Sequence, residues 1–194
     1  MNELKAIAEI NEEIKRIVYA AENISLTATN AMLVARQAGI NAVGFSVVAR
    51  ELRMFSEKMT TAMQGLGELI YRQVLVTAGK RHRSRSVVLL TQAGSYGELA
   101  QTRIAPACAR SQADVDEMEH LIAGLLRELQ ITMRRTAKQC ATGLVIARSA
   151  GIEAAHGGTM TPVLRQIAQG VEEVAGNIAV RVRQLESRLT ETGL

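Results

Sequence analysis

A seven-residue repeat of small and aliphatic residues runs unbroken through the first 38 residues. Spacings of three and four alternate, an average period of about 3.5, which aligns one stripe of a helix with partner helices in a left-handed supercoil. Toward residue 38 the stripe changes from isoleucine to alanine, so we expect neighbouring helices to approach more closely there. The positions are Ile7, Ile10, Ile14, Ile17, Ala21, Ile24, Ala28, Ala31, Ala35 and Ala38.

The repeat resumes after a short break bounded by Gly39 and Gly44. Glycine commonly ends helices because it adopts backbone conformations that other residues avoid. The pattern predicts an antiparallel helical hairpin over residues 1–78, with its turn near 39–44. The inward positions expected after the turn are Phe45, Val48, Leu52, Phe55, Met59, Ala62, Leu66 and Leu69.

A second hairpin is predicted over residues 113–194, because residues 147–154 match residues 35–42 at a shift of 112 (147 − 35). The apolar pattern follows the same shift, which favours a duplication, with the second turn near 151–158. We therefore predict an all-α protein, in which two long antiparallel hairpins form a four-helix, coiled-coil-like bundle with both turns at one end. The expected inward positions are Ile122, Leu126, Leu129, Met133, Thr136, Cys140, Gly143, Ala147, Ala150, Met160, Leu164, Ile167, Val171, Val174, Ile178, Arg181 and Leu185.

The connection between the hairpins, residues 79–112, is too long for a bare turn. It contains an apolar run at 87–90, a Gly94/Gly97 break and Pro106. We predict a basic connecting segment with one short helix around 86–104, and Ser111 as the N-cap of the next helix.

The connection and the residues before it are strongly basic, with no acidic residue between Glu68 and Glu98. Clustered cations can bind nucleic acid or an anionic membrane, although a solvated loop is the alternative interpretation. Aromatic residues for stacking on bases, a helix-turn-helix and a zinc pattern are all missing from the sequence. The candidate anion-binding residues are Arg72, Lys80, Arg81, Arg83 and Arg85.

Composition excludes several other classes. The chain is 47% hydrophobic but only 3% aromatic, which is typical of packed helices rather than a sheet. No apolar run reaches the roughly 20 residues of a membrane-spanning helix, and no signal peptide is predicted. Cys108 and Cys140 have neither disulfide-framework nor metal-ligand spacing, and the three histidines are far apart. We expect no enzyme activity, no cofactor and no metal, and a reducing, cytoplasmic compartment.

Residues 24–60, about a fifth of the chain, carry the most specific pattern: Asn30-Ala31, Ala35, Ala38-Gly39, and Gly44-Phe45-x-Val47-Val48-Ala49-x-Glu51-x-Arg53 with Ser56-Glu57. This pattern resembles the cytoplasmic signalling tip of methyl-accepting chemotaxis receptors. The resemblance implies a four-helix bundle that the family builds from two hairpins of two subunits. It also implies grouping of receptor dimers into trimers near the tip, and docking of a histidine kinase and an adaptor beside it.

The chain departs from the family at charged positions of the tip. It has Val34 where the family is acidic, Gln37 in place of arginine and Ile40 in place of glutamate. Where the family has Gly-Arg-Gly, it has Ala42-Val43-Gly44. Adaptational methylation is not expected, because the only Glu-Glu pairs are 12–13 and 172–173.

These changes leave an apolar turn. Since apolar residues at a hairpin turn cannot all face the bundle, we expect Ile40 and Val43 to form a contact surface. Phe45 lies on the inward pattern, and core packing is its simpler role. The candidate tip residues for protein interaction are Asn30, Val34, Gln37, Gly39, Ile40, Asn41, Val43, Gly44 and Phe45.

The sequence thus predicts a soluble, chemoreceptor-like signalling or adaptor module, either a monomeric pseudo-dimer or a homodimer. It would dock through its hairpin tip to chemotaxis array components, namely receptor tips, the histidine kinase or the coupling adaptor, without ordinary kinase activation. The missing charges would deny a native receptor tip its ion-pair partners. The alternative is a basic helical bundle that binds nucleic acid or an anionic membrane through residues 72–85.

Overall fold

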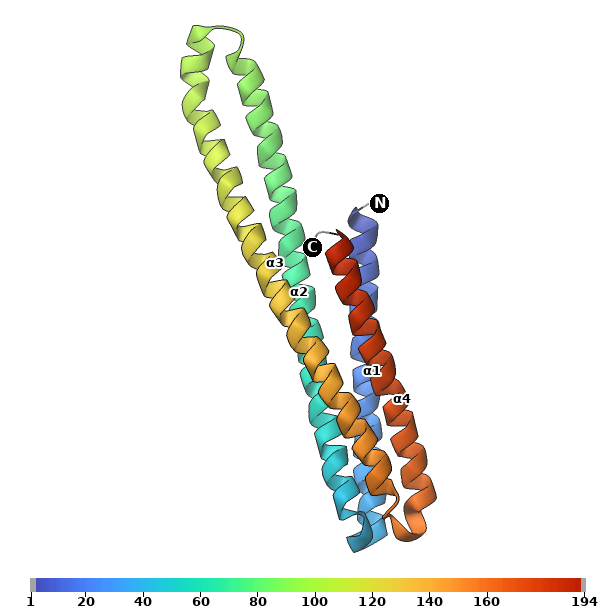
Figure 1. The fold of residues 1–194 in the computed structure, drawn as a ribbon. Coiled ribbons are helices and arrows are strands. Elements are labelled where there is room, and N and C mark those ends of the chain that lie inside the picture. Colours follow the sequence, from blue (N-terminus) through green and yellow to red (C-terminus); the bar gives the residue numbers. More distant parts are fainter. Residues whose placement is uncertain (1–2, 193–194) are drawn as a thin grey trace. The chain divides into compact units, whose positions relative to one another are not determined.

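The computed structural model describes residues 3–192 and, within them, the side chains of residues 5, 7–40 and 42–190. The described residues form helices without any strand, which confirms the predicted all-α helical bundle. The elements in chain order are α1 (Glu3–Ala38), η1 (Gly39–Ala42), α2 (Val43–Gly94), α3 (Glu98–Ala154), η2 (Gly158–Met160) and α4 (Thr161–Thr192), where η marks a short 3₁₀ turn (Figure 1).

The chain divides into two compact units. The first, called the bundle unit, comprises Met1–Gly67 and Ile131–Leu194, and so contains α1, the start of α2, the end of α3, and α4. The second, called the hairpin unit, is Glu68–Gln130, where the rest of α2 turns back into the start of α3.

The inward pattern of α1 is the core of the bundle unit. From Ile10 to Ala35 every predicted inward position is buried, while Ile7 and Ala38 at the two ends are half-buried. The hydroxyl of Ser56 on α2 donates a hydrogen bond to the carbonyl oxygen of Ala21, and α1 also packs directly against α4. The heptad repeat of α1 therefore packs against α2 and α4, in keeping with the predicted helical bundle.

On α2 and α4, five of the predicted inward positions are wrong by one residue, namely Val48, Ala62, Ile167, Val174 and Arg181. Val48 and Val174 are only half-buried, whereas the neighbouring Ala49 and Ala175 are buried. On these helices the buried residues are separated by four and then by three positions. A heptad pattern also permits this order where two neighbouring residues are both apolar, because either of them can face inward. With this correction, burial repeats at the shift of 112, as a duplication predicts: Ala42 and Ala154, Leu52 and Leu164, Met59 and Val171, Leu66 and Ile178 are all buried.

The predicted basic connecting segment at 79–112 is wrong, and so is the short helix at 86–104. In the structure α2 continues to Gly94 and α3 begins at Glu98, so Ser111 lies inside a helix and is not its N-cap. The connection is a tight turn in which the amide of Ser95 donates to the carbonyl oxygen of Gln92 at 3.2 Å. Pro106 is tolerated within α3 on an exposed position, where water can satisfy the carbonyl that loses its partner.

Candidate docking surface

The first turn is built on a glycine. Gly39 adopts φ +71°, in the left-handed region that residues with a Cβ atom rarely enter, and this ends α1. Gly44 allows a close approach between the two turns, because a Cβ atom there would overlap the side chain of Glu153. Both turns of the bundle unit therefore lie side by side, as predicted.

The structure places only some of the predicted tip residues on the surface. Ile40 is 91% exposed, and Val43 is also exposed, which agrees with the expected apolar turn. Phe45 is 1% exposed and belongs to the core, so its assignment to the docking surface is wrong. Val34 and Gly44 are half-buried, and the side chain of Asn41 lies outside the described residues. Asn30, Gln37 and Gly39 are exposed.

Sequence reasoning missed a second stripe, on the outward face of α1. Tyr19, Leu26, Leu33 and Ile40 follow one another every seven residues, and all four are exposed. The signal was present as a second heptad beside the inward one, and it was hidden because the inward repeat explains most apolar residues of this helix. We call Leu26, Leu33 and Ile40, with the exposed Val43 and Val47, the tip surface.

The tip surface is almost free of charge. Between Asn23 and Ala49 the only charged residue is Arg36. Exposed helix faces of globular proteins normally carry charged residues, so an uncharged outward face is unusual.

The same outward positions in the second hairpin are partly apolar. At the shift of 112, Ile131, Val145 and Ile152 are exposed counterparts of Tyr19, Leu33 and Ile40. The counterpart of Leu26, however, is Lys138, and the same stretch of α3 carries further charges at Arg134, Arg135 and Arg148. The first hairpin therefore offers the less charged surface.

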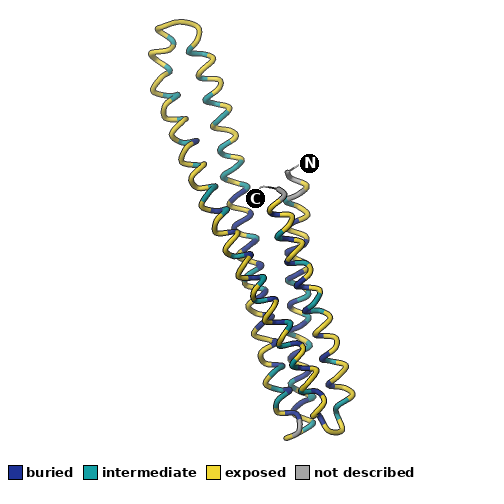
Figure 2. The backbone as a smooth tube through the Cα atoms, in the orientation of Figure 1, coloured by how far each residue is buried: buried dark blue, intermediate teal, exposed yellow. Residues whose placement is uncertain are grey.

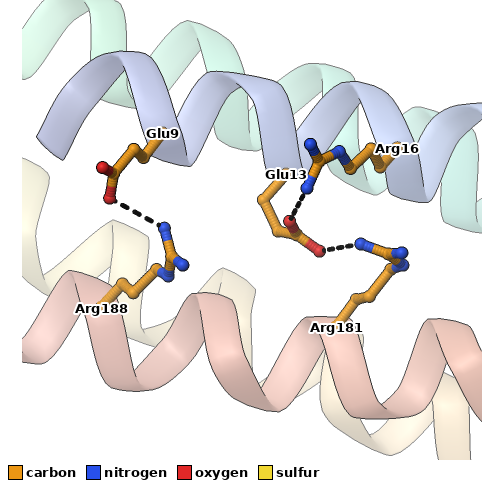
Figure 3. A network of polar contacts seen from close by, with 5 residues as sticks. All are labelled: Glu9, Glu13, Arg16, Arg181 and Arg188. Carbon is orange, nitrogen blue, oxygen red and sulfur yellow. Dashed lines mark hydrogen bonds and ion pairs between the residues drawn. The ribbon is translucent and has the colours of Figure 1, made fainter. Parts of the chain in front are cut away.

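Far from the turn in sequence, an ionic network joins α1 to α4 (Figure 3). The carboxylate of Glu13, only 8% exposed, pairs with Arg181 at 2.6 Å and with Arg16 at 3.4 Å. Glu9 pairs with Arg188 at 3.0 Å. Arg181, which interrupts the apolar pattern of α4, is thus explained by a buried acidic partner on another helix.

Two of the five candidate anion-binding cations lie beside acidic residues of α3. Within the hairpin unit, Lys80 pairs with Glu119 at 2.7 Å and Arg83 with Asp114 at 3.4 Å. Arg72, Arg81 and Arg85 are exposed. The structure therefore does not hold the five cations in one common site, and it engages two of them in ion pairs between α2 and α3.

No family model, curated protein or solved structure matches this chain. The similarity of residues 24–60 to the receptor tip therefore stays a resemblance. Among the described residues, no helix is long and apolar enough to cross a membrane. Within the same residues, no group of three or more histidine, cysteine, aspartate or glutamate side chains is placed to hold a metal ion.

The two cysteines should differ in reactivity. Burial raises the pKa of the Cys140 thiol to about 11, so only about one molecule in a thousand carries the reactive thiolate near pH 8. Cys108 is half-buried and contacts the hydroxyl of Thr91 at 3.7 Å. We expect one thiol to react with a disulfide reagent in the native protein and two after unfolding. The Cys108→Ser variant should lose the rapid reaction, and rapid labelling of this variant would contradict the burial of Cys140.

Proposed function

We propose that this chain docks to components of a chemotaxis array through the tip surface, without ordinary kinase activation. The partner would be a receptor tip, the histidine kinase or the coupling adaptor. The single observation that carries the proposal is the uncharged, outward-facing apolar face at the end of α1, followed at the turn by the strongly exposed Ile40.

A regular outward heptad suits a helical partner. Apolar residues seven apart lie along one line of a helix, and such a line fits the groove between helices of another protein. The resemblance of residues 24–60 to a receptor tip supports array components as that protein. Where the family has charges, Gln37, Ile40 and Val43 offer no ion-pair partner, which supports docking without the usual coupling to the kinase.

The proposal is tested by capture of the receptors, kinase and adaptor of the source organism on the full-length chain. We expect Ile40→Glu combined with Val43→Glu to abolish capture. Burying such side chains contributes about 1.5–3 kcal/mol each, which together corresponds to a loss of about 100-fold or more in affinity.

The matched control is Val180→Glu, at another exposed valine, which lies on α4 and is distant from the tip in sequence. It should leave capture unchanged, and both variants should keep the helical circular dichroism of the parent chain. Equal capture by the tip variant and the parent chain would disprove docking through this surface.

The alternative function, binding of nucleic acid or an anionic membrane, is distinguished by salt and by Arg72→Gln with Arg85→Gln. These two cations are exposed, and changing them leaves the Lys80–Glu119 and Arg83–Asp114 pairs in place. Phosphate binding would fall steeply with salt and weaken in this variant, whereas an apolar tip contact should respond little to either.

A further inference from the structure

Over most of its length, the hairpin unit leaves its apolar residues at least partly exposed. None of the residues from 74 to 114 is buried, although this range contains many aliphatic side chains (Figure 2). Val88, Leu89, Tyr96 and Leu99 are exposed, and an open pocket of about 680 Å³ lies between the helices near their turn. Two helices alone leave at least one side of each uncovered, so this pair has the surface of an incomplete bundle.

At one level of this unit, opposite charges form separate runs on its two helices. From residue 69 to 94, α2 has five cations and no acidic residue, and four of the cations fall between Lys80 and Arg85. On α3 the acidic residues Asp114, Asp116, Glu117 and Glu119 follow one another without a cation. The Lys80–Glu119 and Arg83–Asp114 pairs place these two runs at the same level of the hairpin.

We propose that the hairpin units of two copies of this chain pair side by side, with their turns at the same end and α2 of each copy against α3 of the other. A two-fold axis parallel to the hairpin brings each basic run against the partner's acidic run at the same level. The pairing also covers the half-exposed aliphatic residues and completes a four-helix arrangement.

The charge separation favours a second copy over other partners. A phosphate-rich surface would attract residues 80–85, but the acidic run of α3 at the same level would be repelled. Only a partner with both signs in the same register satisfies both helices, and a second copy has that register by symmetry. This inference does not depend on the proposed function of the tip.

Light scattering on the full-length chain tests the pairing. At low salt and micromolar concentrations we expect a mass of twice 21.0 kDa, decreasing toward the monomer as salt screens the charges. Arg81→Glu with Arg85→Glu should give a monomer, because two acidic runs then face each other. Asp116→Arg with Glu117→Arg should also give a monomer, because two basic runs do.

The mixture of these two variants is the decisive measurement. In a mixed dimer both contacts again join opposite charges, so the dimer mass should return. Neither variant changes Lys80, Arg83, Asp114 or Glu119, and helical circular dichroism checks that each remains folded. A monomeric parent chain at every concentration, dimers that both variants leave intact, or a mixture that stays monomeric would overturn the proposal. Binding of a monomeric parent chain to anionic phospholipid vesicles or duplex DNA would also overturn the proposed pairing.

Discussion

Arg181→Leu alone is expected to lower the free energy of unfolding by about 2–3 kcal/mol, whereas Arg181→Leu combined with Glu13→Leu should come within about 1 kcal/mol of the parent chain. The single change leaves the carboxylate of Glu13 buried and without its 2.6 Å partner. Breaking a buried pair costs about 3–5 kcal/mol in general. We expect less here because the Arg181 side chain is 37% exposed and Arg16 also contacts Glu13.

The double variant has leucine at both positions, and so does the chain itself at the equivalent positions of its repeat. At the shift of 112, Glu13 corresponds to Leu125, and Arg181 corresponds to Leu69. Both leucines are buried, so an apolar pair is already compatible with these positions of the pattern. Replacing a buried ion pair by hydrophobic residues of similar volume is often neutral or stabilising.

The coupling energy between residues 13 and 181 is measured by a double-mutant cycle, with urea denaturation of the parent chain, both single variants and the double variant. We expect this coupling to be large and favourable, and additive losses of stability would contradict it. The matched control is Arg188→Leu, because the Glu9–Arg188 pair is exposed on both sides and should contribute at most about 1 kcal/mol.

The sequence predicted the core of the first hairpin because one repeat contains the needed information. Ile10, Ile17 and Ile24 are buried as their spacing requires. The order of spacings on α2 was not predictable in the same way, since Val48 and Ala49 are both apolar and a heptad accepts either. Which of them faces inward depends on α1 and the other helices that pack there.

The helical nature of residues 79–112 could not be read from local pattern. Between Val76 and Val87 the half-buried positions of α2 include Lys80 and Ser84 and no aliphatic residue, which interrupts the hydrophobic periodicity. The contacts that hold this segment against α3, such as Lys80–Glu119, join residues far apart in the sequence. Glu13 and Arg181 illustrate the same limit, because each looks out of place until the two helices are brought together.

The candidate surface was predictable at the turn and not along the helix. Ile40 and Val43 stood out because a turn cannot bury every apolar residue. Leu26 and Leu33 lie outside the inward repeat, but the sequence alone does not show whether such leucines are exposed or packed against another helix.

Gly143→Ala is expected to destabilise the bundle unit by about 1–3 kcal/mol, although alanine normally stabilises a helix. A Cβ atom at Gly143 would overlap the ring of Phe55, which is itself buried and has little room to move. Because Gly143 has no positive φ, backbone strain is not the cause of the expected loss.

Gly170→Ala is the matched control and should have the opposite sign. Gly170 also lies inside a helix, but nothing lies within 4 Å of a Cβ atom added there, so alanine should stabilise by about 0.5–1 kcal/mol. Thermal and urea unfolding of both variants measure the difference. If both glycine-to-alanine changes stabilised the chain, close packing of Phe55 against Gly143 would be disproved.

The internal repeat also indicates which second substitution should compensate for Gly143→Ala. The counterparts of Gly143 and Phe55 at the shift of 112 are Ala31 and Ile167, so a larger residue at one position accompanies a smaller one at the other. Phe55→Ile alone should leave a space beside Gly143 and cost stability, as cavities in a core do. Combined with Gly143→Ala, the smaller side chain makes room for the new methyl group, and the methyl group fills part of the space. The double variant should therefore be more stable than the sum of the single losses predicts, and strict additivity would show that the two positions do not pack against each other.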